Sequence, residues 1–250
     1  MAQNIYDTAE FFGEYSKLPR SVYGLDGAPE WPTLRKLVGD VKGQRVLDLG
    51  CGFGWFARWA VQEGHARSVL GIDLSENMLN RARQATETAG IEQGVITYSC
   101  GNLEELSLKE REYDLAYSSL ALHYLPDEAL RRLLGEIFKG LESDGKFVFS
   151  IEHPIASAPF DASWKTDEEG RVFWPLNQYW DEGLRVTNWL APGVKKYHRT
   201  VDTYLTYLIE AGFILTAFKE AWEGLDLKPK LEAKAEAHRP YFLLIAVKKP

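Results

Sequence analysis

The pattern of hydrophobic and polar residues along this chain alternates between segments typical of buried strands and segments with the spacing of helices. Val46–Leu49 is an apolar run with one acid, Asp48, and it has the length of a buried strand. Residues 55–60 follow a short glycine-rich stretch and place apolar side chains at helical spacing. The same succession recurs up to residue 151, which predicts a parallel sheet with helices on both faces.

Seven strands and the helices between them are predicted from this pattern. Strands are predicted at residues 46–49, 69–72, 95–99, 113–119, 147–151, 213–221 and 241–247. Helices are predicted at residues 11–18, 31–38, 55–60, 75–90, 128–142 and 201–212. Ligands of doubly wound sheets bind beyond the carboxyl ends of the parallel strands, so we expect the functional site there.

Residues 152–198 interrupt the alternation of strands and helices. This segment holds four of the chain's eight tryptophans and is far longer than an ordinary connection of about 2–6 residues. We interpret it as an aromatic-rich cap over the carboxyl ends of the strands, with a small hairpin. A dimer interface is the alternative, because aromatic side chains favour both.

Three glycines, Gly50, Gly52 and Gly54, lie directly after the first predicted strand. Glycine lets the backbone adopt positive φ and approach a ligand closely, and a helix N-terminus behind it suits a nucleotide-like ligand. Dinucleotide-binding loops have the spacing G-x-G-x-x-G, but the third such position here is Trp55. The spacing therefore disfavours a nicotinamide oxidoreductase.

The stretch Asp48–Gly54 resembles motif I of the class I S-adenosylmethionine-dependent methyltransferases, and the motifs up to residue 151 follow the order of the ubiquinone/menaquinone-methyltransferase-like (type 11) enzymes. The resemblance implies an α/β fold with a Rossmann-like, doubly wound, seven-stranded sheet that is mostly parallel with one antiparallel strand. It implies S-adenosylmethionine as cofactor, with the methionine carboxylate and ribose over the glycine loop. It also implies one domain over residues 1–250, in which residues 1–40 form a helical lid and residues 152–198 the cap.

Asp73 ends the second predicted strand, about 20 residues after the first glycine of the loop. An acid at this distance is placed to accept hydrogen bonds from ribose hydroxyls. The alternative role is that of a helix N-cap, but Ser75 can fill that role and leave Asp73 free for the ligand.

Further cofactor contacts are implied by the resemblance. Leu74 and Met78 would pack near the adenine, and Asn102, where the family often has an acid, keeps an acceptor for the adenine amine. Tyr15 and Arg20 are candidate lid contacts, with helix packing and a solvated charge as their alternatives. The full set of predicted cofactor residues is Tyr15, Arg20, Asp48, Gly50, Cys51, Gly52, Gly54, Asp73, Leu74, Met78, Asn102, Leu103 and Ser118.

Three histidines are candidates for orienting or deprotonating an acceptor. His123 follows the fourth predicted strand, and His153 and His198 lie where the insertion joins the sheet. A histidine can act as a general base because its ordinary pKa lies near neutrality. Structural roles, at a helix start or as braces of the cap, are the alternatives.

Composition excludes several other classes. The net charge is -7, and no run of lysine and arginine forms a cationic stripe for nucleic acid. The two cysteines favour a reducing compartment over a disulfide framework. The five histidines are dispersed, which gives no support to a metal site. Without a signal-peptide pattern or a bilayer-length apolar run, a cytoplasmic protein is expected, with the charged stretch Pro229–Ala237 exposed.

The function that the resemblance implies is methyl transfer from S-adenosylmethionine to an oxygen, nitrogen or carbon atom of a small-molecule acceptor, by a monomer or homodimer. A methyltransferase must align a nucleophile with the methyl–sulfur bond and exclude water. A regulatory or scaffold protein that binds S-adenosylmethionine without transfer is the alternative, followed by the nicotinamide oxidoreductase. The acceptor itself is not identified by the sequence.

Overall fold

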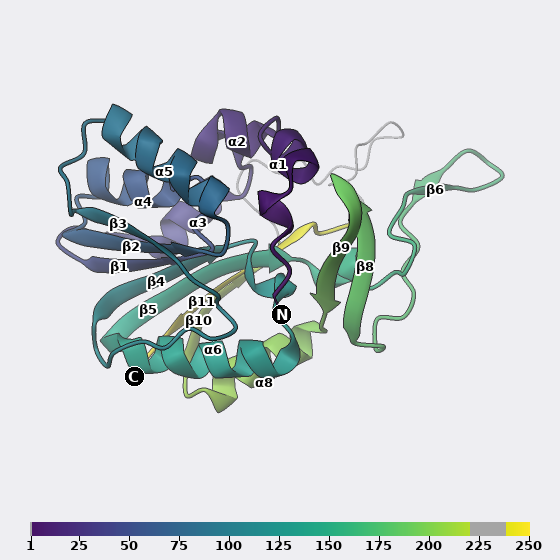
Figure 1. Cartoon of the computed structure of the whole chain (residues 1–250). Coiled ribbons are helices and arrows are strands. Elements are labelled where there is room, and N and C mark those ends of the chain that lie inside the picture. The colour runs from purple at the N-terminus through teal and green to yellow at the C-terminus, as the bar shows by residue number, and fades with distance from the viewer. Residues whose placement is uncertain (1, 221–238) are drawn as a thin grey trace.

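The apolar runs form one seven-stranded sheet at the centre of the molecule (Figure 1). The computed structural model describes residues 2–220 and 239–250, so the charged stretch Pro229–Ala237 lies outside the described part. The strand order is β10-β11-β5-β4-β1-β2-β3. The strands are β1 Arg45–Leu49, β2 Ser68–Asp73, β3 Ile96–Cys100, β4 Tyr113–Ser119, β5 Leu141–Glu152, β10 Ile214–Lys219 and β11 Phe242–Lys248.

Strand directions follow the expectation for a doubly wound sheet. β1 is parallel to both of its neighbours, β2 and β4. β11 is antiparallel to β5 and to β10, which makes it the one antiparallel member. The predicted sheet is thus confirmed in its number of strands and in their directions.

Helices cover both faces of the sheet (Figure 1). On one face, α3 and α4 pack against side chains such as Val46, and on the other, α6 and α8 pack against side chains such as Leu47. Neighbouring residues of β1 serve opposite faces because side chains alternate along a strand. The five longer helices are α3 Trp31–Val38, α4 Trp55–Gln62, α5 Glu76–Thr88, α6 Asp127–Gly140 and α8 Val201–Glu210.

The N-terminal segment consists of short pieces. The helix predicted at residues 11–18 is α1, Ala9–Tyr15, and Pro19 begins α2, Pro19–Val22, because proline is well tolerated in the first turn of a helix. The 3₁₀ turns η1, Ile5–Asp7, and η2, Gly24–Gly27, flank these helices.

The insertion after β5 contains a long hairpin and a smaller one. β8 Gly183–Trp189 and β9 Ala191–His198 pair antiparallel and lie beside α1, whereas β6 Lys165–Thr166 and β7 Val172–Phe173 stand away from the sheet (Figure 1). The two remaining short elements are η3 Leu122–Tyr124 and α7 Pro154–Ser157.

A small apolar cluster joins the long hairpin to the N-terminal segment. Ile5 and Phe11 pack with Ala191 and Val194 of β9. Segments that are far apart in the sequence therefore meet at the carboxyl edge of the sheet. Within the part of the chain that the structure describes, no helix has the length and apolarity needed to cross a bilayer.

Candidate functional site

The glycine loop connects β1 to α4 with all three glycines at positive φ, between 50° and 71°. A Cβ on Gly50 would lie 2.5 Å from the Cβ of Ala121, and one on Gly54 would lie 2.2 Å from the hydroxyl oxygen of Tyr98. A Cβ on Gly52 would meet open space. Gly50 and Gly54 are thus required for close packing, whereas Gly52 keeps bare backbone facing a cavity.

Asp73 links this loop to the end of β2. Its Oδ2 accepts a hydrogen bond of 2.8 Å from the backbone N–H of Gly52, and its Oδ1 accepts one of 2.9 Å from that of Ser75. The Ser75 hydroxyl accepts from the N–H of Met78 and so caps α5, as predicted. Burial raises the pKa of Asp73, and the two backbone donors act against this. Each carboxylate oxygen keeps lone-pair capacity for a ligand.

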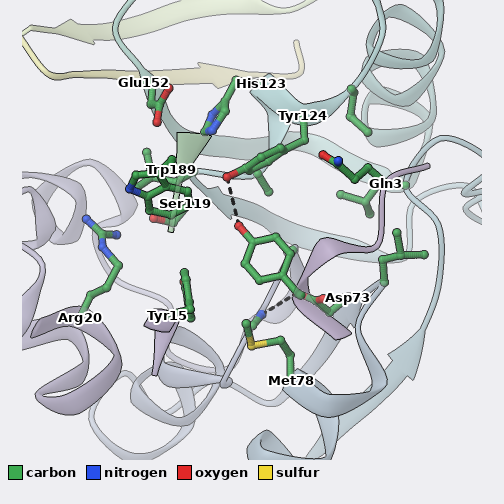
Figure 2. Close-up of a pocket in the computed structure, with 18 of the residues that line it drawn as sticks. Gln3, Tyr15, Arg20, Asp73, Met78, Ser119, His123, Tyr124, Glu152 and Trp189 are labelled. Carbon is green, nitrogen blue, oxygen red and sulfur yellow. Dashed lines mark hydrogen bonds between the residues drawn. The ribbon is translucent and has the colours of Figure 1, made fainter. Parts of the chain in front are cut away.

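A cavity of about 500 Å³ lies above the loop at the carboxyl ends of the parallel strands. This volume is within the range of about 300–1,000 Å³ that is typical of small-molecule sites. Asp73 and Met78 line one side, Arg20 and Tyr15 another, and Glu152 and His123 the end opposite Asp73 (Figure 2). The sheet, the N-terminal segment and the insertion thus all contribute to one cavity.

Most of the predicted cofactor residues line this cavity. They are Tyr15, Arg20, Gly50, Gly52, Asp73, Leu74, Met78, Asn102 and Leu103. Asn102 also forms a turn, because its Oδ1 accepts a 2.9 Å hydrogen bond from the N–H of Glu104. The turn and the ligand contact are compatible, since an amide oxygen has two lone pairs.

Gly54 and Ser118 do not line the cavity. Gly54 is turned toward Tyr98, and the Ser118 hydroxyl donates a 2.8 Å hydrogen bond to the carbonyl of Leu49 inside the sheet. Successive strand residues point to opposite faces, so the neighbouring Ser119 lines the cavity instead. Ser118 thus faces the interior of the sheet, and Ser119 faces the cavity.

Asp48 and Cys51 line a second cavity of about 90 Å³ beneath the loop, which shares Arg20 and Gly52 with the first. Asp48 is 2% exposed, and its Oδ2 has no hydrogen-bond partner among the described residues. Burial, with a smaller contribution from the charge of Asp73, raises the pKa of Asp48 to about 8. An ionised Asp48 therefore requires a cationic partner.

Arg20 lies between the two cavities and is held from one side. Its Nη2 lies 3.0 Å from Oε1 of Glu30, a residue that is fully buried. The guanidinium points toward Ser119 in Figure 2. Arg20 thus presents its remaining donors to a ligand from the lid side.

Of the three candidate histidines, only His123 lines the cavity. The imidazole of His153 accepts from the N–H of Ile155 and lies 3.0 Å from Glu220, so it starts α7. The two ring nitrogens of His198 are hydrogen-bonded to Ser157 and to the carbonyl of Tyr179. The geometry thus gives His153 and His198 the bracing role that was their alternative.

His123 is 3% exposed, and its Nδ1 has no hydrogen-bond partner among the described residues. Burial lowers the pKa of His123 to about 4, although the nearby carboxylate of Glu152 opposes the shift. The imidazole is therefore neutral at pH 7.

Several residues of the cavity were not predicted as site residues. Gln3, Tyr6, Glu152, Trp189 and Lys195 line it, from the N-terminal segment, the end of β5 and the hairpin. Trp189 belongs to the aromatic insertion that was interpreted as a cap over the site, although the residue itself was not predicted. Nothing in the N-terminal sequence singled out Gln3.

The N-terminal segment crosses the mouth of the cavity as a strap, residues 2–7. Gln3 donates to the carbonyl of Gly193 and accepts from the N–H of Lys195, so it is bound to β9. At the other end, Asp7 accepts from the hydroxyl of Ser75 and from the N–H of Asn77 at the start of α5. Tyr6 lies between, with its hydroxyl 3.2 Å from that of Tyr124.

Within the described ranges 2–220 and 239–250, no group of three or more histidine, cysteine or acidic side chains is arranged to hold a metal ion. The cysteines are unpaired, Cys51 being buried and Cys100 exposed.

Comparisons with known proteins agree with this geometry. Residues 46–145 match a family model described as a methyltransferase domain. A solved S-adenosylmethionine-dependent methyltransferase from Mesorhizobium loti is 48% identical, covers 90% of this chain and 100% of its own, and superposes with a TM-score of 0.80. A malonyl-[acyl-carrier protein] O-methyltransferase of Hamiltonella defensa is 30% identical over 140 residues, 56% of this chain. The match spans about half of that relative's length.

Proposed function

Because this chain belongs to the class I S-adenosylmethionine-dependent methyltransferases of the type 11-like group, we propose that it methylates a small-molecule acceptor bound in the 500 Å³ cavity. The observation that carries this proposal is that the strap and the long hairpin partly cover the cavity. The strap and the hairpin meet over its mouth through Gln3, so the space beneath suits a small acceptor.

The cavity residues fit S-adenosylmethionine in their chemistry. Asp73 offers acceptors for the ribose hydroxyls, and Leu74, Met78 and Leu103 offer an apolar site for the adenine. The bare backbone at Gly52 leaves room for the methionine moiety.

Two charged side chains beside the glycine loop are complementary to the carboxylate and the ammonium group of the methionine moiety. Arg20 provides donors for a carboxylate, and Asp48 provides a buried acid for an ammonium group. When bound, the cofactor supplies an electrophilic methyl group on a sulfonium sulfur. The protein has to orient the acceptor and exclude water, and the buried rings around the cavity serve both purposes.

Turnover with a pool of metabolites tests the proposal. Purified protein is incubated with methyl-labelled S-adenosylmethionine and a deproteinised extract of small metabolites, and mass spectrometry follows the label. We expect S-adenosylhomocysteine together with labelled small molecules. Cofactor binding without any labelled product would contradict transfer to a small molecule.

A second candidate acceptor is an acyl group on a carrier protein. The similarity to the Hamiltonella defensa enzyme favours it, although only about half of that relative is matched. Malonyl-carrier protein in the same assay distinguishes the two, because the label would then appear on the protein-bound product.

A further inference from the structure

The end of the cavity opposite Asp73 is built from three separate elements. Glu152 is the last residue of β5, His123 lies on η3, and Trp189 ends the cap strand β8. Figure 2 shows Glu152 and His123 near each other at the end of the pocket opposite Asp73 and Met78. If the cofactor occupies the side of Asp73, this end receives the acceptor.

Glu152 presents a carboxylate oxygen to this end. Lys196 of β9 donates to Oε1 of Glu152 at 2.5 Å, and its side chain is only 7% exposed. A carboxylate has two oxygens that accept hydrogen bonds, and Lys196 donates to Oε1. Glu152 lines the cavity but Lys196 does not, so the acceptor meets the carboxylate and not the ammonium that balances it.

Glu152 remains ionised at neutral pH. Burial acts to raise its pKa, but the charge and hydrogen bond of Lys196, with a smaller contribution from the charge of Arg239, hold the pKa below its ordinary value. His123 is neutral under the same conditions. This end therefore offers a negative charge and no group that exchanges a proton near pH 7.

The other charged side chains of the cavity lie elsewhere. Arg20 is paired with Glu30 on the lid side, and the exposed Lys195 lies at the rim, where its backbone is bonded to Gln3. Asp73 and Glu104 add negative charge. Neither Arg20 nor Lys195, the arginine and lysine among the described lining residues, forms an ion pair with Glu152.

Aromatic rings complete the acceptor end. The ammonium of Lys196 lies 4.6 Å from the ring centroid of Trp189 and 5.9 Å from that of Tyr124. Both distances are within the reach of a cation–π interaction, which stabilises positive charge over a ring face. The rings of Trp189 and Tyr124 thus stabilise the Lys196 ammonium and also line the cavity.

We propose, as a refinement that rests on the proposed function, that the acceptor is an uncharged amine whose nitrogen is methylated beside Glu152. The nitrogen lone pair forms the new N–C bond, and the electrons of the C–S bond stay on sulfur to give S-adenosylhomocysteine. Positive charge moves from sulfur to nitrogen, so no proton has to leave during the step. The Glu152 carboxylate stabilises the charge that develops on nitrogen.

Other acceptor classes fit this end less well. A carboxylate or phenolate would bring negative charge against Glu152, and like charges in a buried site repel. An alcohol or carbon acid would require a base, and the neutral His123 is a weak one with its pKa near 4. An amine needs only to enter in its neutral form.

The labelling experiment above identifies the atom that is methylated. We expect the label in N-methyl compounds of the metabolite extract, found by mass spectrometry and confirmed by NMR. Label in methyl esters, methyl ethers or C-methyl compounds would overturn the amine proposal and leave the proposed function intact. No labelled small molecule at all would overturn the proposed function and this inference with it.

Glu152→Gln tests the role of the carboxylate with the amine found in this way. We expect kcat to fall at least about 30-fold, a loss of about 2 kcal/mol of transition-state stabilisation, while the affinity for S-adenosylmethionine changes less than threefold in calorimetry. Glu128→Gln, on an exposed position of α6, is the matched control and should retain full activity.

A double variant guards against misfolding, since Glu152→Gln alone leaves Lys196 buried without its partner. Glu152→Gln with Lys196→Met removes both charges, and we expect the same loss of kcat with normal thermal unfolding. Calorimetry of the amine against protein saturated with S-adenosylhomocysteine gives a readout without turnover. Amine binding and kcat within threefold of the wild type in either variant would contradict the proposal.

Discussion

At the residue scale, burial sets the charge of the ionisable groups around the cavity. Asp48 and His123 are 2% and 3% exposed, and burial favours the neutral form of each. Burial raises the pKa of Asp73 as well, but two backbone N–H groups directed at its carboxylate oppose this shift. The surroundings of Asp73 therefore favour an ionised side chain more than those of Asp48 do, because Oδ2 of Asp48 has no hydrogen-bond partner among the described residues.

Asp73→Ala should weaken the binding of S-adenosylmethionine by about 1–3 kcal/mol, because buried ribose hydroxyls would lose their acceptor. Isothermal titration calorimetry measures this directly. Asp202→Ala, at an exposed site on α8, is the control and should bind normally. An unchanged affinity of the Asp73 variant would contradict the ribose role.

His123 should titrate with a pKa of about 4. Because its folded pKa is depressed, the imidazole stays neutral down to that pH and gains its proton only as the pH falls further. Two-dimensional NMR of the histidine rings between pH 3.5 and 8 checks this, with His123→Gln to assign the signal. A midpoint near 6.5 for that signal would show that the ring is solvated.

At the scale of elements, the segment from β1 to β5 was predictable because the apolar periodicity and the capping or turn residues of each element lie within that element. Ser75 caps α5 as its position suggested, and Trp31–Val38 forms a helix with the predicted bounds. The strap was not predictable, since Gln3 is fixed by a strand 190 residues away. Ser118 and Ser119 are both polar at the end of a buried strand, so the sequence pattern did not show which of them faces the cavity.

Substitutions at two glycines of the loop should affect different properties, the stability of the fold at Gly54 and the binding of the cofactor at Gly52. Gly54→Ala places a methyl group 2.2 Å from the hydroxyl of Tyr98 at positive φ, and we expect a loss of about 1–3 kcal/mol in unfolding free energy. Gly52→Ala meets open space and should cost about 1 kcal/mol, but its methyl group enters the cavity and should weaken cofactor binding at least tenfold.

Urea denaturation and calorimetry on both glycine variants provide the comparison. Each variant is the control for the other. Equal effects on stability and on binding in the two proteins would contradict the division of roles within the loop.

At the scale of the whole molecule, the buried acid Asp48 makes the stability of the fold depend on pH. The folded-state pKa of Asp48 is about 8, against 3.8 for the unstructured residue. Since the folded state binds the proton more tightly, the contribution of this proton to stability is complete below pH 4 and is lost as the pH rises toward 8.

Asp48→Asn should therefore make the ligand-free protein more stable at pH 8 than the wild type, by about 1–4 kcal/mol. The gain should shrink toward pH 5, where Asp48 is largely protonated in the folded wild type. Urea denaturation at the two pH values measures it, and Asp202→Asn is the exposed control. A gain that is the same at pH 5 and pH 8 would show that Asp48 is not the titrating group.

The strap also has a consequence for the order in which the site is completed during synthesis. Gln3 is synthesised before its partner Lys195, which lies 192 positions further on. At about 5–20 residues per second, the first residues wait roughly 10–40 s for the hairpin that holds them. A nascent chain arrested before β8 would thus contain β1 to β5 and the glycine loop while its entrance still stands open.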